Sequence, residues 1–147
     1  MASSGMVWKG GVTLTQKIES TQRKAIKTII GKILITMDGV AVDTAKYMRE
    51  FIESVPSSIR PGKIGRVDTG SMQGDVKSKE YYPTGKNSWA VEAGWVDDLR
   101  DYYLTQEHGG MAHDLLVGDR KISPMHMLTA GRIYMELELH KGVKAIR

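Results

Sequence analysis

The sequence has no cysteine, only four prolines, and few aromatic residues: three Trp, six Tyr and one Phe in 147 positions. The absence of cysteine excludes disulfide bonds and thiolate metal sites, and it fits a protein assembled in a reducing cytoplasm. Since only 41% of the residues are hydrophobic, we expect a modest core and a large surface, part of which becomes buried on assembly.

Long hydrophobic runs are also missing. The most apolar segment, residues 29–37, contains Lys32 and is too short to cross a hydrocarbon layer of about 30 Å. Residues 1–6 have neither the basic start nor the apolar run of a secretory signal. We therefore expect a soluble protein without a membrane partner, and the length fits a single domain, 1–147.

Charge is distributed unevenly along the chain. The net charge is +4, but residues 1–60 carry nine Lys or Arg against five Asp or Glu, whereas residues 61–120 carry seven against ten. Before Asp38, six cations accompany a single acid, Glu19: Lys9, Lys17, Arg23, Lys24, Lys27 and Lys32. This pattern fits a nucleic-acid partner, an acidic protein partner, or a solvated helix face. No aromatic residues interleave with these cations, so base stacking is not indicated.

Residues 14–55 have the 3.6-residue apolar period of a helix. The periodic residues are Leu14, Ile18, Ile26, Ile29, Ile30, Ile33, Met37, Val40, Ala41, Ala45, Met48, Ile52 and Val55. Pro56 ends the pattern. A straight helix of this length would measure about 60 Å, longer than a small domain is wide. We therefore expect a bend or break near Gly39, with Asp38 capping a second helix.

A β-hairpin is predicted within residues 72–96. In the second strand, residues 88–96, Trp89, Val91, Ala93 and Trp95 alternate with the other face. The first strand is expected at 72–82, with Met72 and Val76 on one face, and residues 83–87 supply the turn. Because an isolated hairpin is marginal in water, the long helix is expected to cover its Trp face.

Three further elements are expected after the hairpin. Asp97 and Asp98 cap a short helix at about 99–108, which Gly109 and Gly110 end. Residues 111–123 form a loop or a second small hairpin around Gly118-Asp119.

The last element is a helix at 124–140, with Ser123 as its N-cap, Pro124 at its first position and Gly142 as its stop. The predicted fold class is α+β: a long N-terminal helix packed on a small antiparallel sheet, with a short helix and a C-terminal helix.

Candidate catalytic and metal-binding residues do not form a recognisable site. His108 and His113 lie near Glu107 and Asp114, but no histidine pair has the i, i+4 spacing of a zinc protease. Asp97, Asp98 and Asp101 fit helix capping better than ion binding. No Gly-x-Ser-x-Gly elbow is present, and no Gly-Lys-Ser/Thr follows Gly109-Gly110. We expect no catalytic residue, metal or cofactor.

The segment Asp68-Thr69-Gly70 predicts a tight turn that begins a strand. Asp and Thr side chains bond nearby backbone amides, and Gly permits a positive φ. The same triplet occurs in aspartic proteases, where two carboxylates share a proton. The flanking residues Arg66 and Gln73-Gly74 are not the hydrophobic strands that such a protease needs, so the turn interpretation is preferred.

The order of these motifs resembles that of the tail-completion, or head–tail joining, proteins of long-tailed bacteriophages. Residues that match the family pattern are Asp68, Thr69, Gly70 and Met72, then Tyr102, Glu107 and Gly109, and finally Pro124 and Ala130. The chain departs from the pattern in having Gly110 for Thr, Tyr103 for a small residue, Met125 for an aromatic, one extra residue before Ala130 and an unusually long first helix. The resemblance covers residues 55–140.

This resemblance implies a structural protein of the virion neck, assembled in the host cytoplasm as a ring, expected to be a hexamer. Implied neighbours are a head-closure or adaptor ring, the tail terminator and the tail tube, with DNA possible in the channel. A tail-terminator or head-closure subunit is an alternative within the class. A small basic nucleic-acid-binding protein is the alternative from another class, and an enzyme is a third.

The expected ring contact lies on the basic half of the first helix. Its apolar stripe extends beyond what a narrow sheet can cover, and a ring subunit needs surfaces for unlike neighbours. We therefore expect Lys24, Lys27, Ile29 and Ile33 at an interface.

Overall fold

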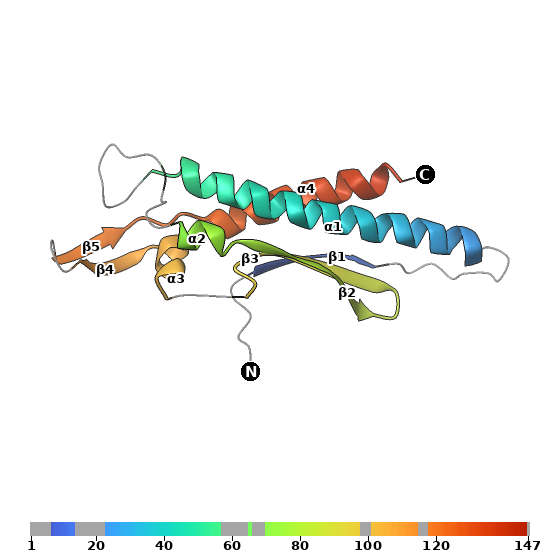
Figure 1. Cartoon of the computed structure of the whole chain (residues 1–147), viewed down its shortest axis with the longest axis horizontal. Helices are drawn as coiled ribbons and strands as arrows, with labels where there is room; N and C mark the ends of the chain where they lie inside the picture. The colour runs from blue at the N-terminus through green and yellow to red at the C-terminus, as the bar shows by residue number, and fades with distance from the viewer. Residues whose placement is uncertain are drawn as a thin grey trace.

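The computed structural model describes residues 7–13, 23–56, 65, 70–97, 101–114 and 118–146. Two long helices lie side by side over one face of a three-stranded sheet, and a small hairpin projects at one end (Figure 1). The elements in chain order are β1 (Val7–Thr13), α1 (Arg23–Ser54), α2 (Ser71–Gly74), β2 (Lys77–Gly85), β3 (Ser88–Gly94), α3 (Asp101–His108), β4 (Gly110–Asp114), β5 (Gly118–Ile122) and α4 (Met127–Lys144). The predicted α+β fold class is confirmed.

The sheet is antiparallel, with strand order β1-β3-β2. Along β3, Val91 and Ala93 are fully buried in the core beneath the helices, as the alternating sequence pattern indicates. The pairing of β1 with β3 was not predicted, because β1 contains Gly10 and Gly11 and glycine is depleted in strands. Helix α1 packs over β2 and β3, and α4 packs over β1.

Helix α1 is a single helix of 32 residues, about 48 Å long at 1.5 Å per residue. The expected break near Gly39 is wrong, because the buried face continues without interruption from Met37 through Val40 and Ala41. Asp38 does not cap a second helix. Its Oδ1 accepts a hydrogen bond from the Tyr81 backbone N–H (2.7 Å), which ties α1 to β2. The predicted helical residues 14–22 lie outside the described part of the chain.

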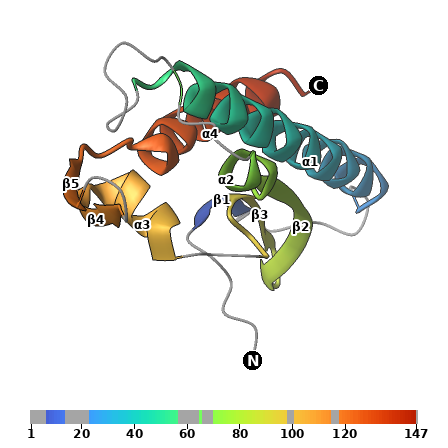
Figure 2. The same ribbon diagram turned by 60° about the vertical axis from the view of Figure 1, so that its left-hand side comes forward.

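Helices α1 and α4 run antiparallel in close contact (Figures 1 and 2). Gly131 makes this approach possible, since a Cβ there would lie 2.0 Å from Met48 Cε. Tyr47 and Tyr134 stack with ring centroids 4.5 Å apart. The two-helix layer is therefore fixed by a small residue and an aromatic pair.

The first predicted hairpin has different bounds from those expected. Residues 71–74 form the short helix α2, and β2 begins only at Lys77. Met72 and Val76 are both buried, but they lie in α2 and in the connection after it, so their expected placement in a strand is wrong. The turn is reduced to residues 86–87, because Pro83 fits within an irregular edge strand.

The C-terminal helix also starts and ends later than predicted. Ser123 and Pro124 lie in an extended connection, and α4 begins at Met127 after His126, which has a left-handed conformation (φ 58°). Gly142 lies inside α4, which continues to Lys144. The short helix at residues 101–108 and the second hairpin, β4–β5, agree with the prediction.

Candidate functional site

Five side chains join α1, α2, α3, β3 and α4 through buried or half-buried hydrogen bonds, and we call this cluster the joint: Arg49, Gln73, Trp95, Tyr103 and Glu107. It contains Glu107, the one charged side chain of the described helices that is buried. Glu107 is also one of the residues that carry the family resemblance. The joint is therefore a candidate site.

Glu107 is almost fully buried, with 2% of its surface exposed. Its Oε1 accepts a hydrogen bond from the backbone N–H of Leu128 (2.9 Å), in the first turn of α4. The N-cap residue of that helix, His126, makes no side-chain cap, so Glu107 caps α4 from a neighbouring helix. Such a cap satisfies a backbone donor that the helix cannot satisfy itself.

Burial raises the pKa of the Glu107 carboxyl above its usual range, and the backbone N–H groups of Leu128 and Met127 offset part of this effect. Its Oε2 is buried and has no hydrogen-bond partner among the described residues. A buried acid with a raised pKa occurs at catalytic sites. Here, however, the other carboxyl oxygen is committed to the start of α4, so the geometry supports a structural cap.

Trp95 and Tyr103 form the apolar centre of the joint. Both are fully buried, and their rings stack with centroids 5.0 Å apart. Trp95 Nε1 donates to the Met72 carbonyl (3.0 Å), and the Tyr103 hydroxyl donates to Asp75 Oδ2. Each polar tip therefore has a partner beside α2, and α3 and the end of β3 are held there.

Arg49 and Gln73 connect α1 with the same region. Arg49 Nη1 donates to the Val76 carbonyl (2.9 Å). Gln73 Nε2 donates to the Arg49 carbonyl (3.0 Å) and to Glu53 Oε1 (2.6 Å). These bonds use side chains to satisfy backbone and carboxylate groups.

The residues that carry the family resemblance occupy structural positions. Gly70 has φ 82° and precedes α2, so the predicted positive φ is confirmed, but a helix follows it in place of the predicted strand. Gly109 has φ 79°, and a Cβ there would lie 3.0 Å from Pro124 Cδ. Met72 is buried. Gly110 begins β4 with φ 148°. Asp68 and Thr69, and the side chain of Tyr102, lie outside the described residues.

A second polar cluster lies on the sheet face opposite the helices. Glu92 is 4% exposed, and its Oε1 accepts from the Tyr82 hydroxyl (2.8 Å) and lies 3.4 Å from Lys9 Nζ. Hydrogen bonding to Tyr82 and Glu92 raises the pKa of Lys9, and burial raises the pKa of Tyr82. Lys79 Nζ lies 5.2 Å from the Tyr82 ring centre. The carboxylate is thus neutralised by its neighbours.

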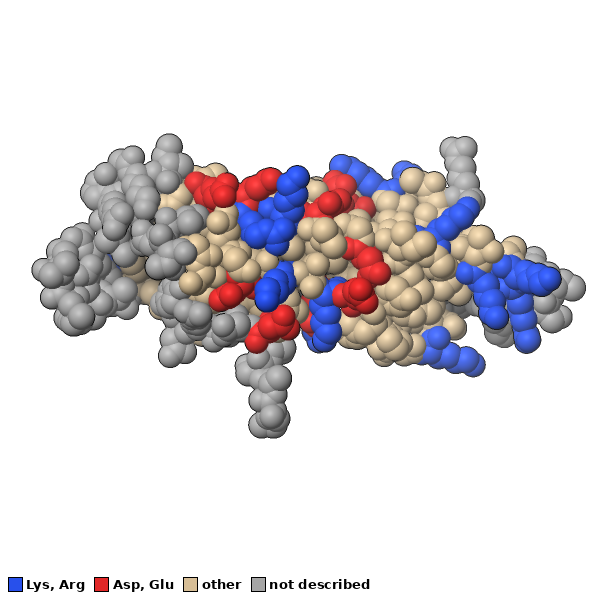
Figure 3. Space-filling view, in the orientation of Figure 1, with Lys and Arg blue, Asp and Glu red and all other residues tan. Residues whose placement is uncertain are grey.

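The end of the molecule opposite the joint, at the N-terminus of α1, is basic. The first turns of α1 extend beyond the sheet and beyond α4 (Figures 1 and 2), and Lys and Arg side chains gather there (Figure 3). We call the following exposed residues the basic end: Arg23, Lys24, Lys27, Lys32 and Lys144. No carboxylate among the described residues pairs with Arg23, Lys24 or Lys27.

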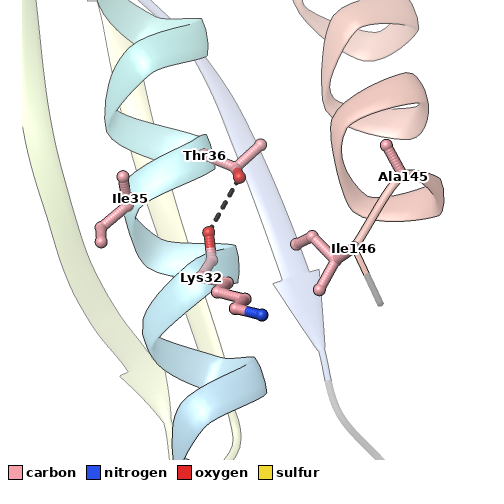
Figure 4. A pocket seen from close by; sticks show the side chains of 5 residues that line it. All are labelled: Lys32, Ile35, Thr36, Ala145 and Ile146. Atoms are coloured by element: carbon pink, nitrogen blue, oxygen red, sulfur yellow. Dashed lines mark hydrogen bonds between the residues drawn. The ribbon is translucent and has the colours of Figure 1, made fainter.

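A shallow groove of about 460 Å³ lies beside the basic end, between α1 and the residues that follow α4 (Figure 4). Its lining is mainly apolar, with one cation: Lys32, Ile35, Thr36, Ala145 and Ile146. The Thr36 hydroxyl donates to the Lys32 carbonyl (2.8 Å). The described residues that line the groove include no carboxylate and no histidine, so its composition favours contact with another apolar surface.

The four residues predicted at an interface differ in their exposure. Lys24 and Lys27 are exposed, and Ile29 is 41% exposed, so all three are available for contact. Ile33 is only 4% exposed and belongs to the core. Its assignment to an interface is therefore wrong, because the sheet and α4 cover α1 closer to its N-terminus than the sequence pattern indicates.

Within the described residues, no three His, Cys, Asp or Glu side chains are grouped as metal ligands. No helix of the described chain is both long and apolar enough to cross a membrane. Comparison with protein families, with curated proteins and with solved structures finds no match.

The sequence did not predict the pairings that Trp95, Tyr103 and Arg49 make in the joint. Trp95 was predicted to be covered, but its hydrogen bond to Met72 joins positions 23 residues apart. The Arg49 bond to Val76 spans 27 residues. No local pattern signals such pairs, although a Trp and a Tyr within a short polar stretch are a cue to an anchored segment.

Proposed function

We propose that this chain is a structural subunit of the neck of a long-tailed bacteriophage: a tail-completion or head–tail connector protein that joins the tail to the capsid as a homo-oligomeric ring. The main support is that Glu107, which belongs to the motif Tyr102, Glu107 and Gly109, is a buried cap for α4. A motif that specifies architecture is what a structural family requires, whereas an enzyme family requires residues that face a substrate.

The other motif residues support the same conclusion. Gly70 and Gly109 have positive φ values, where a side chain is strained. Gly109 also lies against Pro124, so the second and third motifs meet in space. Residues from three separate motifs therefore contribute to the form of the subunit, which explains why they would occur together.

The surface supports an assembling subunit. Large apolar side chains are exposed on both long helices: Ile29, Ile35, Val42, Ile133 and Leu137. Exposed apolar side chains that lie together on a surface mark contacts with partners. A ring subunit needs a side contact that closes the ring and end surfaces for unlike neighbours, and these residues supply candidates on both helices.

The basic end favours a second candidate, a small nucleic-acid-binding protein. Four cations lie within the first ten residues of α1, and Asp38 is the first acid of that helix. Phosphate binding by such a cluster would be salt-sensitive and independent of sequence. The neck proposal accommodates the same feature, because the basic end would then face an acidic neighbouring ring or DNA in the channel.

Native mass spectrometry of the purified chain, with and without duplex DNA, tests the proposal. A closed ring, expected to be a hexamer, without DNA supports the neck subunit. A monomer that forms a salt-sensitive DNA complex supports the nucleic-acid-binding protein and contradicts the proposal. Portal, capsid and tail-tube genes adjacent to the gene for this chain would provide independent support.

A further inference from the structure

The two edges of the main sheet differ in how they are protected. An edge strand exposes unpaired backbone N–H and C=O groups, which pair readily with another chain unless the strand is short, irregular, charged or covered. In β2 the register shifts twice, Pro83 removes a donor, and the Tyr81 N–H is occupied by Asp38. These features protect the β2 edge from further pairing.

Among the described residues, the β1 edge has only one of these features, the charged side chain of Lys9. All seven residues of β1 pair with β3 without a register shift, and the strand contains no proline. Its one charged side chain, Lys9, is engaged with Glu92 across the sheet. Gly10 is buried, and the exposed Gly11 adds no bulk beside the backbone. The edge is therefore regular and suited to one more strand.

The hairpin β4–β5 has too few strands to be stable by itself. It has only two strands of five residues each, and a two-stranded hairpin alone is marginal in water. Among the described elements, only α3 makes an extended contact with it. It projects from the end of the molecule remote from the basic end (Figure 1). Joining another sheet would stabilise such a hairpin.

We propose that the β4–β5 hairpin of one copy pairs with the β1 edge of the next copy, extending its antiparallel sheet. The donor and acceptor are different surfaces of the same chain, so the contact is heterologous and generates a ring if the rotation closes. The inference rests on the proposed ring assembly and names the contact that closes it. It also accounts for a hairpin that contributes little to the core of its own subunit.

Cysteine cross-linking tests the contact without background, since the chain has no native cysteine. The test variant is Lys9→Cys combined with Lys121→Cys, and a second is Lys9→Cys with Met111→Cys, because Met111 and Lys121 face each other in the hairpin. Moving the hairpin cysteine along residues 119–121 covers the possible registers. Under oxidation we expect a ladder of covalent multimers that ends at the ring size.

Lys79 provides a matched control, because Lys9 and Lys79 flank Glu92 in the same register on opposite edges of the sheet. Lys79→Cys with Lys121→Cys should give no ladder. A variant with residues 111–121 replaced by a short Gly/Ser linker should keep the circular dichroism spectrum of the fold and remain monomeric.

The outcomes separate the two proposals. Rings that cross-link through β1 support the contact. Rings that cross-link through β2, or through neither edge, overturn the contact but leave the neck function standing. Rings formed by the linker variant also overturn the contact. A wild-type chain that stays monomeric at every concentration removes both the ring and the contact that rests on it.

Discussion

The joint and the basic end show how differently the two ends of one helix are used. At the C-terminal end of α1, Arg49 bonds to Gln73 of α2 and to Val76 in the connection after α2, and Ile52 is fully buried. At the N-terminal end, residues 23–32 include no buried residue. The same apolar period runs through both ends. Amphipathic periodicity therefore predicts a helix, but the length of its partners decides how much of the helix becomes core.

Electrostatics sharpens the contrast between the ends. A helix N-terminus carries about half a positive charge, which favours acids in the first turn. The first turn of α1 has no acid and instead carries Arg23 and Lys24. The joint does the opposite at the start of α4, where a carboxylate, Glu107, meets the backbone N–H groups. The joint is arranged for stability, and the basic end keeps a positive potential that an anionic partner could use.

The largest expected change in stability comes from a substitution at Ile33, where the core of α1 begins. Ile33→Asp places a charge at a position that is 4% exposed, and we expect it to destabilise the fold by at least about 3–5 kcal/mol or prevent folding. Ile29→Asp, one turn away at 41% exposure, should change the unfolding free energy by less than about 1 kcal/mol. Urea unfolding followed by circular dichroism measures both. Similar losses for the two variants would show that the core extends to Ile29.

Glu107→Ala removes the cap of α4 and should cost about 1–3 kcal/mol in chemical denaturation at neutral pH. Glu107→Gln keeps a hydrogen-bond acceptor and the side-chain shape without the buried charge. Because burial raises the pKa of Glu107 in the folded state, the Gln variant should be at least as stable as the wild type at pH 7.

The stability difference between Glu107→Gln and the wild type should depend on pH. The folded state binds more protons than the unfolded state between the usual carboxyl pKa and the raised one, so wild-type stability falls as pH rises through that window. The advantage of Glu107→Gln should therefore shrink as the pH is lowered from 7 into the window. An advantage that grew at lower pH would show that the joint favours the ionised carboxylate.

Gly70→Val should cost about 1–2 kcal/mol, because a β-branched residue is strained at φ 82°. Gly74→Val is the matched control. A Cβ would have no neighbour within 4 Å at either glycine, and only Gly70 has a positive φ. Thermal unfolding measures the difference. Equal shifts in Tm would show that the backbone of Gly70 relaxes freely and does not fix the entry into α2.

Sequence patterns predicted the elements whose causes are local and missed those whose causes are distant. The apolar period of α1, the apolar alternation that predicts β3 and the turn residues of the second hairpin are local signals, and all three elements are confirmed. The start of α4 was placed at Ser123-Pro124, which has the residues of a helix start. The observed start at Met127 depends on Glu107, 20 residues earlier in the chain. The assembly of the joint likewise required long-range pairs.

The smallest expected effect on stability, at the basic end, separates folding from docking. Lys24→Glu with Lys27→Glu places acids near the positive end of α1, so the unfolding free energy should rise by about 0.3–1 kcal/mol. Docking on an acidic ring or DNA should weaken, most strongly at low salt. Lys144→Glu removes a cation from the last turn of α4, where cations are favourable, so its stability should change in the opposite direction. Calorimetry of the variants and binding to wild-type partners at two salt concentrations measure both quantities. Reduced stability of the double variant would mean that the lysines serve the fold. Unchanged docking would mean that the positive potential at this end meets only solvent.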